Sequence, residues 1–245
     1  KGVLARHSQK RPAHVVISAI EHPAIVEPAR CLERNGCELS VVEPDRHGLI
    51  WPEAVESAIR PNTVLVSIMH ANNEIGTVQP IRKIAGICHD RGILLHTDAA
   101  QSVGKIPTRV VELGVDLLSL AGHKFYAPKG IGALYVRHGV AIDAVTHGAG
   151  HEGGLRPGTE NVPYIVALGH AATLADEMLD ESAEHMAAPR DRLWTRIEEG
   201  TEQTAKVHGV GAERLPNTLS VTFPGVAGAE ILRRTPEVCA STGAA

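Results

Sequence analysis

The chain alternates short, continuous apolar runs with stretches of helical periodicity. Continuous apolar runs, rather than in–out alternation, are typical of strands covered on both faces. Strands are therefore predicted over His14–Ser18, Glu38–Val42, Thr63–Met69, Ile93–His96, Asp116–Leu120 and Ile131–Val136. Helices are predicted between them, over Pro23–Asn35, Pro52–Arg60, Ile81–Arg91 and Thr108–Leu113. This alternation predicts βαβ units and an α/β fold with a mostly parallel central sheet flanked by helices.

The pattern changes after Asn161. A long helical stretch over Val162–Glu199 follows, and Pro189 predicts a kink or break within it, because proline cannot donate to the helical ladder. An apolar alternation over Asn217–Phe223 and a short helix near Glu230 come next. We therefore predict a large domain over residues 1–160, then a linker helix and the start of a smaller α+β domain over 161–245.

Composition narrows the classes of function. With 43% hydrophobic and 21% charged residues and a net charge of −4, the 245-residue chain gives no reason to expect nucleic acid or a membrane as partner. No apolar run approaches the roughly 20 residues that span a bilayer. Four cysteines without a CxxC pair favour a reducing cytoplasm over a disulfide framework or zinc site. His147 and His151 stand among glycines, so the spacing of helical metal ligands does not apply and no metal is expected. Both termini are expected to be cuts rather than natural ends.

Polar side chains follow four of the predicted strands where each strand ends. They are Glu21-His22, Asn72-Asn73-Glu74, Asp98 with Gln101, and His123-Lys124. Because the carboxyl ends of parallel strands meet at one edge of a sheet, where ligands of such folds bind, we expect these side chains to lie together.

The chemistry of this set fits pyridoxal phosphate. Burial lowers the pKa of a lysine, and a neutral amine such as that of Lys124 bonds an aldehyde. A carboxylate such as that of Asp98 keeps the pyridine nitrogen protonated. Each residue also has a structural alternative. Lys124 could be a solvated loop lysine, Asp98 and Asn73 turn residues, Gln101 a surface residue, and His22 the cap of the helix that begins at Pro23.

Four longer motifs carry a resemblance to a known family. MHANNEIG at 69–76, HTDAAQSVGKIP at 96–107, AGHKFYAPKGIGALYVR at 121–137 and RPGTENV at 156–162 closely resemble the cysteine desulfurases. That resemblance implies the aspartate-aminotransferase fold type I and pyridoxal 5′-phosphate as cofactor. It implies conversion of L-cysteine to L-alanine with sulfur passed through an enzyme persulfide. A sulfur-acceptor protein, in iron–sulfur cluster or thio-cofactor synthesis, is then the expected partner.

The resemblance also implies a role for each matching site residue. Lys124 would hold the cofactor and move protons, and His22 would stack on its ring and assist. Asp98 would pair with the pyridine nitrogen. The other implied cofactor contacts are Asn73 and Gln101 near the 3′ oxygen, His123 near the phosphate, and Thr159 at the phosphate of a partner subunit's cofactor. A homodimer is implied by this last contact.

The chain departs from the family pattern in several places, two of which bear on the site. The nucleophilic cysteine of the family would follow a stretch like Ser241–Ala245, so the span given is expected to be inactive alone. A phosphate-binding serine of many desulfurases is replaced by Ala121. Selenocysteine lyase, with the same fold and cofactor, is the alternative activity. A non-catalytic scaffold and an aminotransferase are further alternatives, although intact Lys124, Asp98 and His22 argue against the scaffold.

Overall fold

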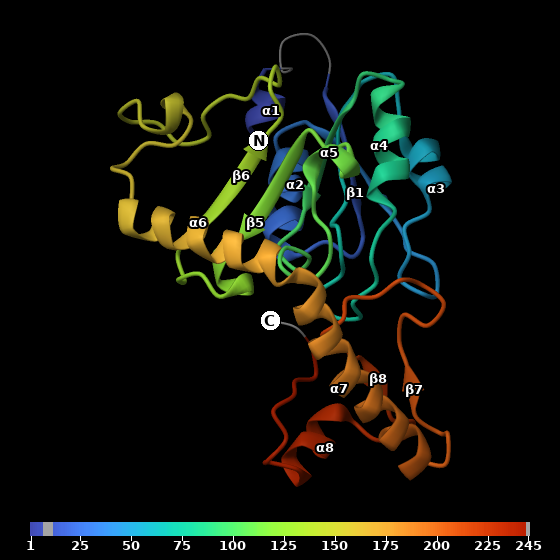
Figure 1. Ribbon diagram of the computed structural model, residues 1–245. Coiled ribbons are helices and arrows are strands. Elements are labelled where there is room, and N and C mark those ends of the chain that lie inside the picture. The colour runs from blue at the N-terminus through green and yellow to red at the C-terminus, as the bar shows by residue number, and fades with distance from the viewer. Residues whose placement is uncertain (7–11, 244–245) are drawn as a thin grey trace.

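A six-stranded sheet forms the centre of the computed structural model, which describes residues 1–6 and 12–243 (Figure 1). The strands are β1 (His14–Ser18), β2 (Glu38–Val42), β3 (Thr63–Ser67), β4 (Leu94–Asp98), β5 (Leu117–Ala121) and β6 (Gly132–Val136). Their order is β2-β1-β3-β4-β5-β6, and all pairs are parallel except β5 with β6. The predicted mostly parallel α/β sheet is therefore confirmed.

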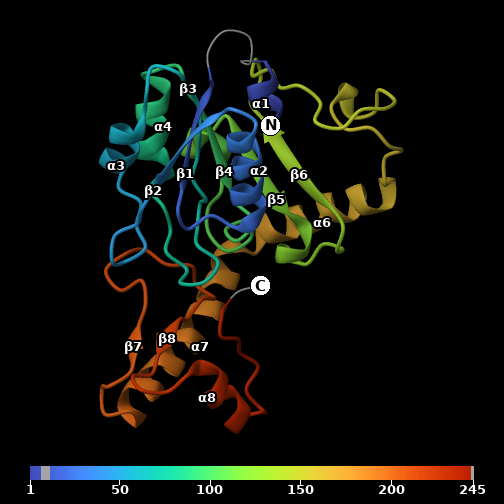
Figure 2. The ribbon, with the colours of Figure 1, turned by 180° about the vertical axis from the view of Figure 1, so that it is seen from behind.

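Helices cover both faces of the sheet, as Figures 1 and 2 show from opposite sides. One face packs against α1 (Gly2–Ala5) and α2 (Pro23–Arg34). The other packs against α3 (Pro52–Ala58), α4 (Ile81–His89) and α5 (Val110–Leu113). Within β1, Val15 and Ile17 belong to the first core and Val16 to the second. Because both faces are covered, the strand is apolar throughout and does not alternate.

Two histidines inside the sheet are paired with hydroxyl groups on the neighbouring strands. His96 contacts Ser67 and Ser119 through Nδ1 and Nε2, at 2.8 Å each, and His14 contacts Thr63 and Ser40 at 2.7 and 2.9 Å. Each ring therefore links three strands. Burial lowers the pKa of His14 and lowers the pKa of His96 to about 4, so both rings are neutral at physiological pH.

The long helical stretch is divided into α6 (Val162–Glu177) and α7 (Leu179–Gly200). Of the predicted kink or break at Pro189, the break is wrong, because the helix is interrupted at Met178 and Pro189 is inside α7. The physical reason is tertiary. A Cβ on Gly104, in the turn after β4, would lie 3.2 Å from the Cβ of Ala175, so α6 passes closely along that turn. After Met178 the chain bends and α7 leaves the sheet (Figure 1).

The remaining elements are small. Two 3₁₀ turns, η1 (Gly122–Phe125) and η2 (Glu152–Gly154), precede α6, and β7 (Lys206–Val207), β8 (Val221–Thr222) and α8 (Gly228–Arg234) follow α7. The segment between β7 and β8 is joined to the large sheet's loops by two backbone hydrogen bonds. Val78 N donates to Glu213 O and Leu215 N to Gly76 O, both at 2.8 Å. The domain division at 160/161 stays a prediction. In the described part of the chain, no helix is both long and apolar enough to span a bilayer.

Candidate active site

The carboxyl ends of β1, β3, β4 and β5 form one continuous edge, which faces α6 and α7 in Figure 1. Backbone hydrogen bonds continue across it beyond the strands. His70 N donates to Asp98 O and Ala99 N to Ser119 O, both at 2.9 Å. The polar segments that follow these strands therefore leave the sheet side by side, as expected from the parallel topology.

Lys124 is half-buried on η1, between β5 and β6. Gly122 allows this tight turn, because a Cβ there would lie 2.9 Å from Leu168 and 3.0 Å from Ala127 and Ile131. Gly122 also donates its N–H to Ile131 O and accepts from Ala127 N, each at 3.0 Å. The turn that presents Lys124 is therefore fixed by backbone bonds and by α6.

A second lysine lies close to the first and was not anticipated from the sequence. Lys105 donates from Nζ to the backbone O of Gln101 at 2.9 Å and to its Oε1 at 3.4 Å. Burial, and then the charge of Lys124, lower the pKa of Lys105 to about 8. The only sequence signal was the four-residue spacing from Gln101. Because Lys105 occupies the amide oxygen, the amide nitrogen of Gln101 is left to face other partners.

Asp98 ends β4 and is 9% exposed. Its Oδ1 accepts from Ala100 N at 2.9 Å. Asp98 therefore does stabilise a turn, which was the structural alternative to a cofactor-binding role. Among the described residues, Oδ2 makes no hydrogen bond. One carboxylate oxygen therefore shapes the turn, and the other remains for a ligand.

His22 is half-buried and caps α2, as its structural alternative predicted. Its Nδ1 accepts from Ala24 N at 3.1 Å. The accepting nitrogen carries no proton, so in the neutral ring the proton lies on Nε2. The cap fixes the ring and leaves the N–H at Nε2 free to donate a hydrogen bond.

Asn72, rather than Asn73, holds the turn after β3. Asn72 Oδ1 accepts from Glu74 N and Ile75 N, both at 3.0 Å, and its Nδ2 donates to Ile20 O at 3.2 Å. Asn73 is half-buried beside it, and its side chain makes no hydrogen bond within the described residues. The side chain predicted to meet a ligand is thus the one that the turn does not use.

Glu21 is a buried carboxyl group. The sequence predicted its position after the first strand but gave it no role. It is 7% exposed, and its Oε1 accepts from Ser18 Oγ at 2.6 Å and from Met69 N at 2.7 Å. Its Oε2 is buried without a partner among the described residues. Burial is the main cause that raises the pKa of Glu21 to about 7, and the nearby charge of Asp98 raises it further.

Two predicted residues lie differently from the rest. His123 is exposed on η1. Thr159 is exposed on the loop between η2 and α6, and this loop lies beside the sheet rather than at the carboxyl edge (Figure 1). The structure therefore does not bring Thr159 to the other site residues of this chain. Within residues 1–6 and 12–243, no three His, Cys, Asp or Glu side chains gather to hold a metal ion.

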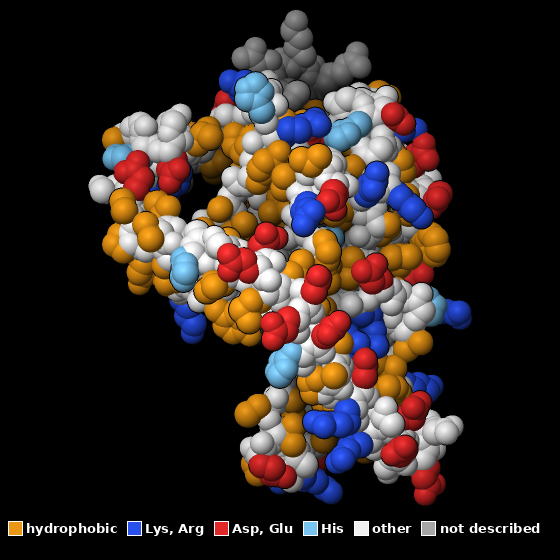
Figure 3. All heavy atoms as spheres, viewed as in Figure 1, with side chains coloured by type: hydrophobic (Ala, Val, Ile, Leu, Met, Phe, Trp, Pro, Cys, Tyr) orange, Lys and Arg blue, Asp and Glu red, His pale blue; other side chains and the backbone are white. Residues whose placement is uncertain are grey.

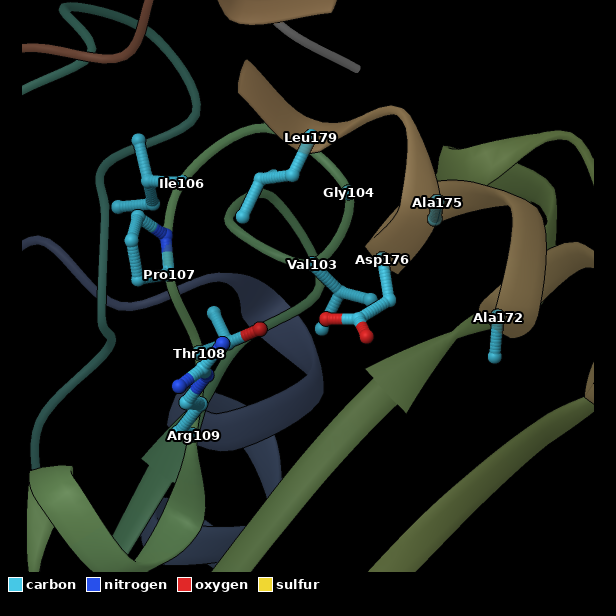
Figure 4. A pocket seen from close by; sticks show the side chains of 10 residues that line it. All are labelled: Val103, Gly104, Ile106, Pro107, Thr108, Arg109, Ala172, Ala175, Asp176 and Leu179. Carbon is cyan, nitrogen blue, oxygen red and sulfur yellow. The ribbon is translucent and has the colours of Figure 1, made fainter.

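Two hollows on the described part of the chain are lined by residues other than Lys124 and Asp98. A hollow of about 170 Å³ lies behind the turn after β4, where Figure 4 shows Thr108 and Arg109 opposite Asp176 of α6. A hollow of about 370 Å³ lies on α7, between Arg192 and Arg196. The candidate site is an open sheet edge beside the first of these hollows.

A mostly parallel sheet with a lysine and a carboxylate at its carboxyl edge fits the class of pyridoxal-phosphate proteins of fold type I. The aminotransferase class-V family model matches residues 2–245, so the chain belongs to that family. Curated relatives include the cysteine desulfurase IscS of Histophilus somni, strain 2336, which is 46% identical over the whole chain, and that of Escherichia coli, strain HS, which is 44% identical over 98% of it.

Solved structures agree with this assignment. A structure titled NifS-like protein is 38% identical, with a TM-score of 0.89 over 96% of this chain and 64% of its own. SspA in complex with cysteine is 38% identical, with a TM-score of 0.80 over 97% of this chain and 65% of its own. The fold class and the resemblance to cysteine desulfurases are thereby confirmed. The chain spans 60% of the length of the curated relatives.

Proposed function

We propose that the protein carrying this chain is a pyridoxal-phosphate-dependent cysteine desulfurase, which converts L-cysteine to L-alanine and transfers the sulfur through an enzyme persulfide. The observation that carries the proposal is the shared strand edge of Lys124, Asp98 and His22 in a class-V chain whose relatives are named cysteine desulfurases. Bound pyridoxal phosphate would supply the aldehyde and the electron sink of the reaction.

The donor set at the edge fits that cofactor. The half-buried amine of Lys124 would bind the aldehyde carbon and afterwards move protons, because it lies on a turn fixed by Gly122. The uncommitted oxygen of Asp98 would bind the pyridine nitrogen. His22 would lie over the ring and assist proton transfer, with its Nε2–H free to donate because Nδ1 is committed to the cap of α2. Asn73 and the amide nitrogen of Gln101 would donate to the 3′ oxygen. His123 would lie near the phosphate.

The C-terminal segment supports delivery of sulfur at this edge. A Cβ on Gly243 would lie 4.0 Å from Oε1 of Glu74, in the turn after β3. The stretch Ser241–Gly243, which resembles the approach to the nucleophilic cysteine of the family, thus passes beside the strand ends. The sulfur would then pass to an acceptor protein for iron–sulfur cluster or thio-cofactor synthesis. The four free cysteines favour a reducing, cytoplasmic setting.

We also propose that the working unit is a homodimer, in which Thr159 reaches the cofactor phosphate of the partner subunit. This would account for its distance from the site of its own chain. The apolar α6, which directly follows the Thr159 loop, contains no buried residue and would be covered in the dimer.

The test compares two lysines of one turn in the protein at its full natural length. With pyridoxal phosphate added, we expect an absorption band near the visible edge and alanine formation from L-cysteine. Lys124→Ala should abolish both, because the amine that binds the aldehyde is gone. The matched control is Lys129→Ala, an exposed lysine of the same connection, which should retain both.

Three outcomes would contradict the proposal: no band in the unaltered protein, a band that survives Lys124→Ala, or a band without alanine and persulfide. Selenocysteine is assayed in parallel. Turnover of selenocysteine with a collapse of turnover on cysteine would identify a selenocysteine lyase instead.

A further inference from the structure

We propose that Glu21 is a positioning residue of this site, held as a neutral carboxyl group that fastens the end of β1 to the end of β3 and leaves Asp98 as the charged carboxylate. The inference rests on the proposed function for its consequences at the cofactor. The geometry of Glu21 is independent of that function.

One carboxyl oxygen of Glu21 joins the ends of β1 and β3 by hydrogen bonds. Oε1 of Glu21 accepts from the hydroxyl of Ser18, the last residue of β1, and from the N–H of Met69, just beyond β3. A second link between the same two segments runs from Asn72 Nδ2 to Ile20 O. Together they fix the backbone that carries His22 relative to the turn that carries Asn73.

The other carboxyl oxygen indicates the neutral form. Oε2 is buried and unpartnered within the described residues. An ionised carboxylate there would leave charge without a hydrogen bond in a region shielded from water, which costs more than the unpaired O–H of the neutral form. Asp98 is the charged group that acts on Glu21 across the edge, and it disfavours a second negative charge. Two neighbouring carboxyl groups in unlike environments take unlike protonation states. The raised pKa of Glu21 agrees with this division.

The consequence concerns the predicted partner of the pyridine nitrogen. If both carboxyl groups were ionised, their negative charges would repel each other at the strand edge. A neutral Glu21 adds no second negative charge beside Asp98. It also holds the backbone that carries His22 in place through the bonds to Ser18 and Met69.

The test separates shape from charge at one position, in the protein at its full natural length. Glu21→Gln keeps an acceptor at Oε1 and remains neutral, and Glu21→Ala removes the link. We expect Glu21→Gln to lower kcat by no more than about threefold, with KM for cysteine little changed. We expect Glu21→Ala to lower kcat by roughly tenfold or more and to weaken cofactor binding, as loss of a buried bond predicts. The matched control, Glu27→Gln, removes an exposed carboxylate of α2 and should change neither quantity.

A spectroscopic readout tests the protonation state without catalysis. Infrared difference spectra of cofactor-free protein at about pH 6, well above the ordinary pKa of glutamate, should show a protonated carboxyl band that Glu21→Gln removes and Glu27→Gln retains. Absence of that band would overturn the proposal. So would Glu21→Gln as damaging as Glu21→Ala, or Glu21→Ala equal to the unaltered protein. Because the band is measured without cofactor, a failure of the proposed desulfurase activity alone leaves it unaffected.

Discussion

At the scale of single residues, the protein holds several buried titratable groups in their uncharged forms. Burial lowers the pKa of His70 to about 4, and His70 Nδ1 contacts Ser102 Oγ at 2.8 Å. Burial also lowers the pKa of His96, whereas it raises the pKa of Glu21. The stability that Glu21 contributes is complete below its ordinary pKa and is lost as pH rises to about 7. The histidines oppose this trend below pH 6.5.

The loss of stability at acid pH that the buried histidines cause gives a prediction for His96. Its pKa is about 4 in the folded protein and 6.5 ordinarily, so between these values the unfolded chain binds a proton that the folded chain does not. The free energy of unfolding therefore falls as pH decreases through that window, by roughly 3 kcal/mol for a fully buried ring. His96→Gln should remove this part of the pH dependence, as measured by urea unfolding from pH 7 to pH 4.

The control for this experiment is His138→Gln, which replaces an exposed histidine just after β6. The assignment to His96 fails if both variants keep the acid slope of the unaltered protein, or if both lose it equally.

The role of a residue could be predicted where the chemistry of one cofactor demands one residue type. It was less predictable where neighbouring residues determine the burial and the pKa of a side chain. Lys124 and Asp98 were identified from the demands of a single cofactor, and their roles stay predictions. Glu21 and Lys105 were not, because their character comes from burial and from contacts across strands. Nothing in the sequence places Glu21 against Met69 N, or Lys105 within reach of the charge of Lys124.

At the scale of elements, the β5–β6 hairpin is the support of the predicted cofactor lysine. Its antiparallel pairing runs from Leu117–Val136 to Ala121–Gly132, next to η1. Gly132 lies closely against the facing strand, because a Cβ there would be 2.6 Å from Leu120 O. The nearest atom belongs to the backbone, so no side chain can move aside.

Gly132→Ala should therefore force β6 away from β5 and displace the turn that carries Lys124. We expect a melting temperature lower by several degrees, consistent with about 1–3 kcal/mol for overpacking, and a weaker cofactor absorption band. Thermal unfolding and cofactor titration check the two effects. Gly150→Ala, where a Cβ meets nothing within 4 Å, is the control. Equal stability of the two variants would show that the hairpin tolerates the added methyl group.

Elements with strong local patterns were predicted well. β1 and β2 have the predicted bounds, and the other strands differ by a few residues at their ends. The break in the long helix was placed at Pro189 instead of Met178, because a close approach between Gly104 and Ala175 is invisible in the sequence. In the smaller α+β segment, β8 covers only Val221–Thr222 of the predicted run Asn217–Phe223, where few neighbouring strands are present to extend it.

At the scale of the whole molecule, α6 is an apolar helix without a buried residue. Val162 and Val166 are 59% and 65% exposed, and Figure 3 shows hydrophobic side chains gathered along this helix. A helix that is apolar on all sides normally lies in a protein interior or an interface.

The proposed homodimer therefore predicts that Val166→Arg weakens self-association, since it places a charge in the interface. Light scattering coupled to size exclusion, on the protein at its full natural length, should show the mass shift from dimer towards monomer. Val111→Arg, on α5, changes a valine that is 88% exposed and should leave the mass unaltered. A monomeric unaltered protein, or a dimer that withstands Val166→Arg, would contradict this interface.

The backbone bonds between Gly76 and Leu215, and between Val78 and Glu213, have a consequence for the order of folding. They join segments that lie far apart in the chain. Closing the intervening loop costs conformational entropy, which is offset only when these contacts form. During synthesis the residues of β1–β6 leave the ribosome before residues 213–215. The turn that carries Asn73 can therefore form these two hydrogen bonds only afterwards. Its ability to bind a cofactor would then develop later than the sheet.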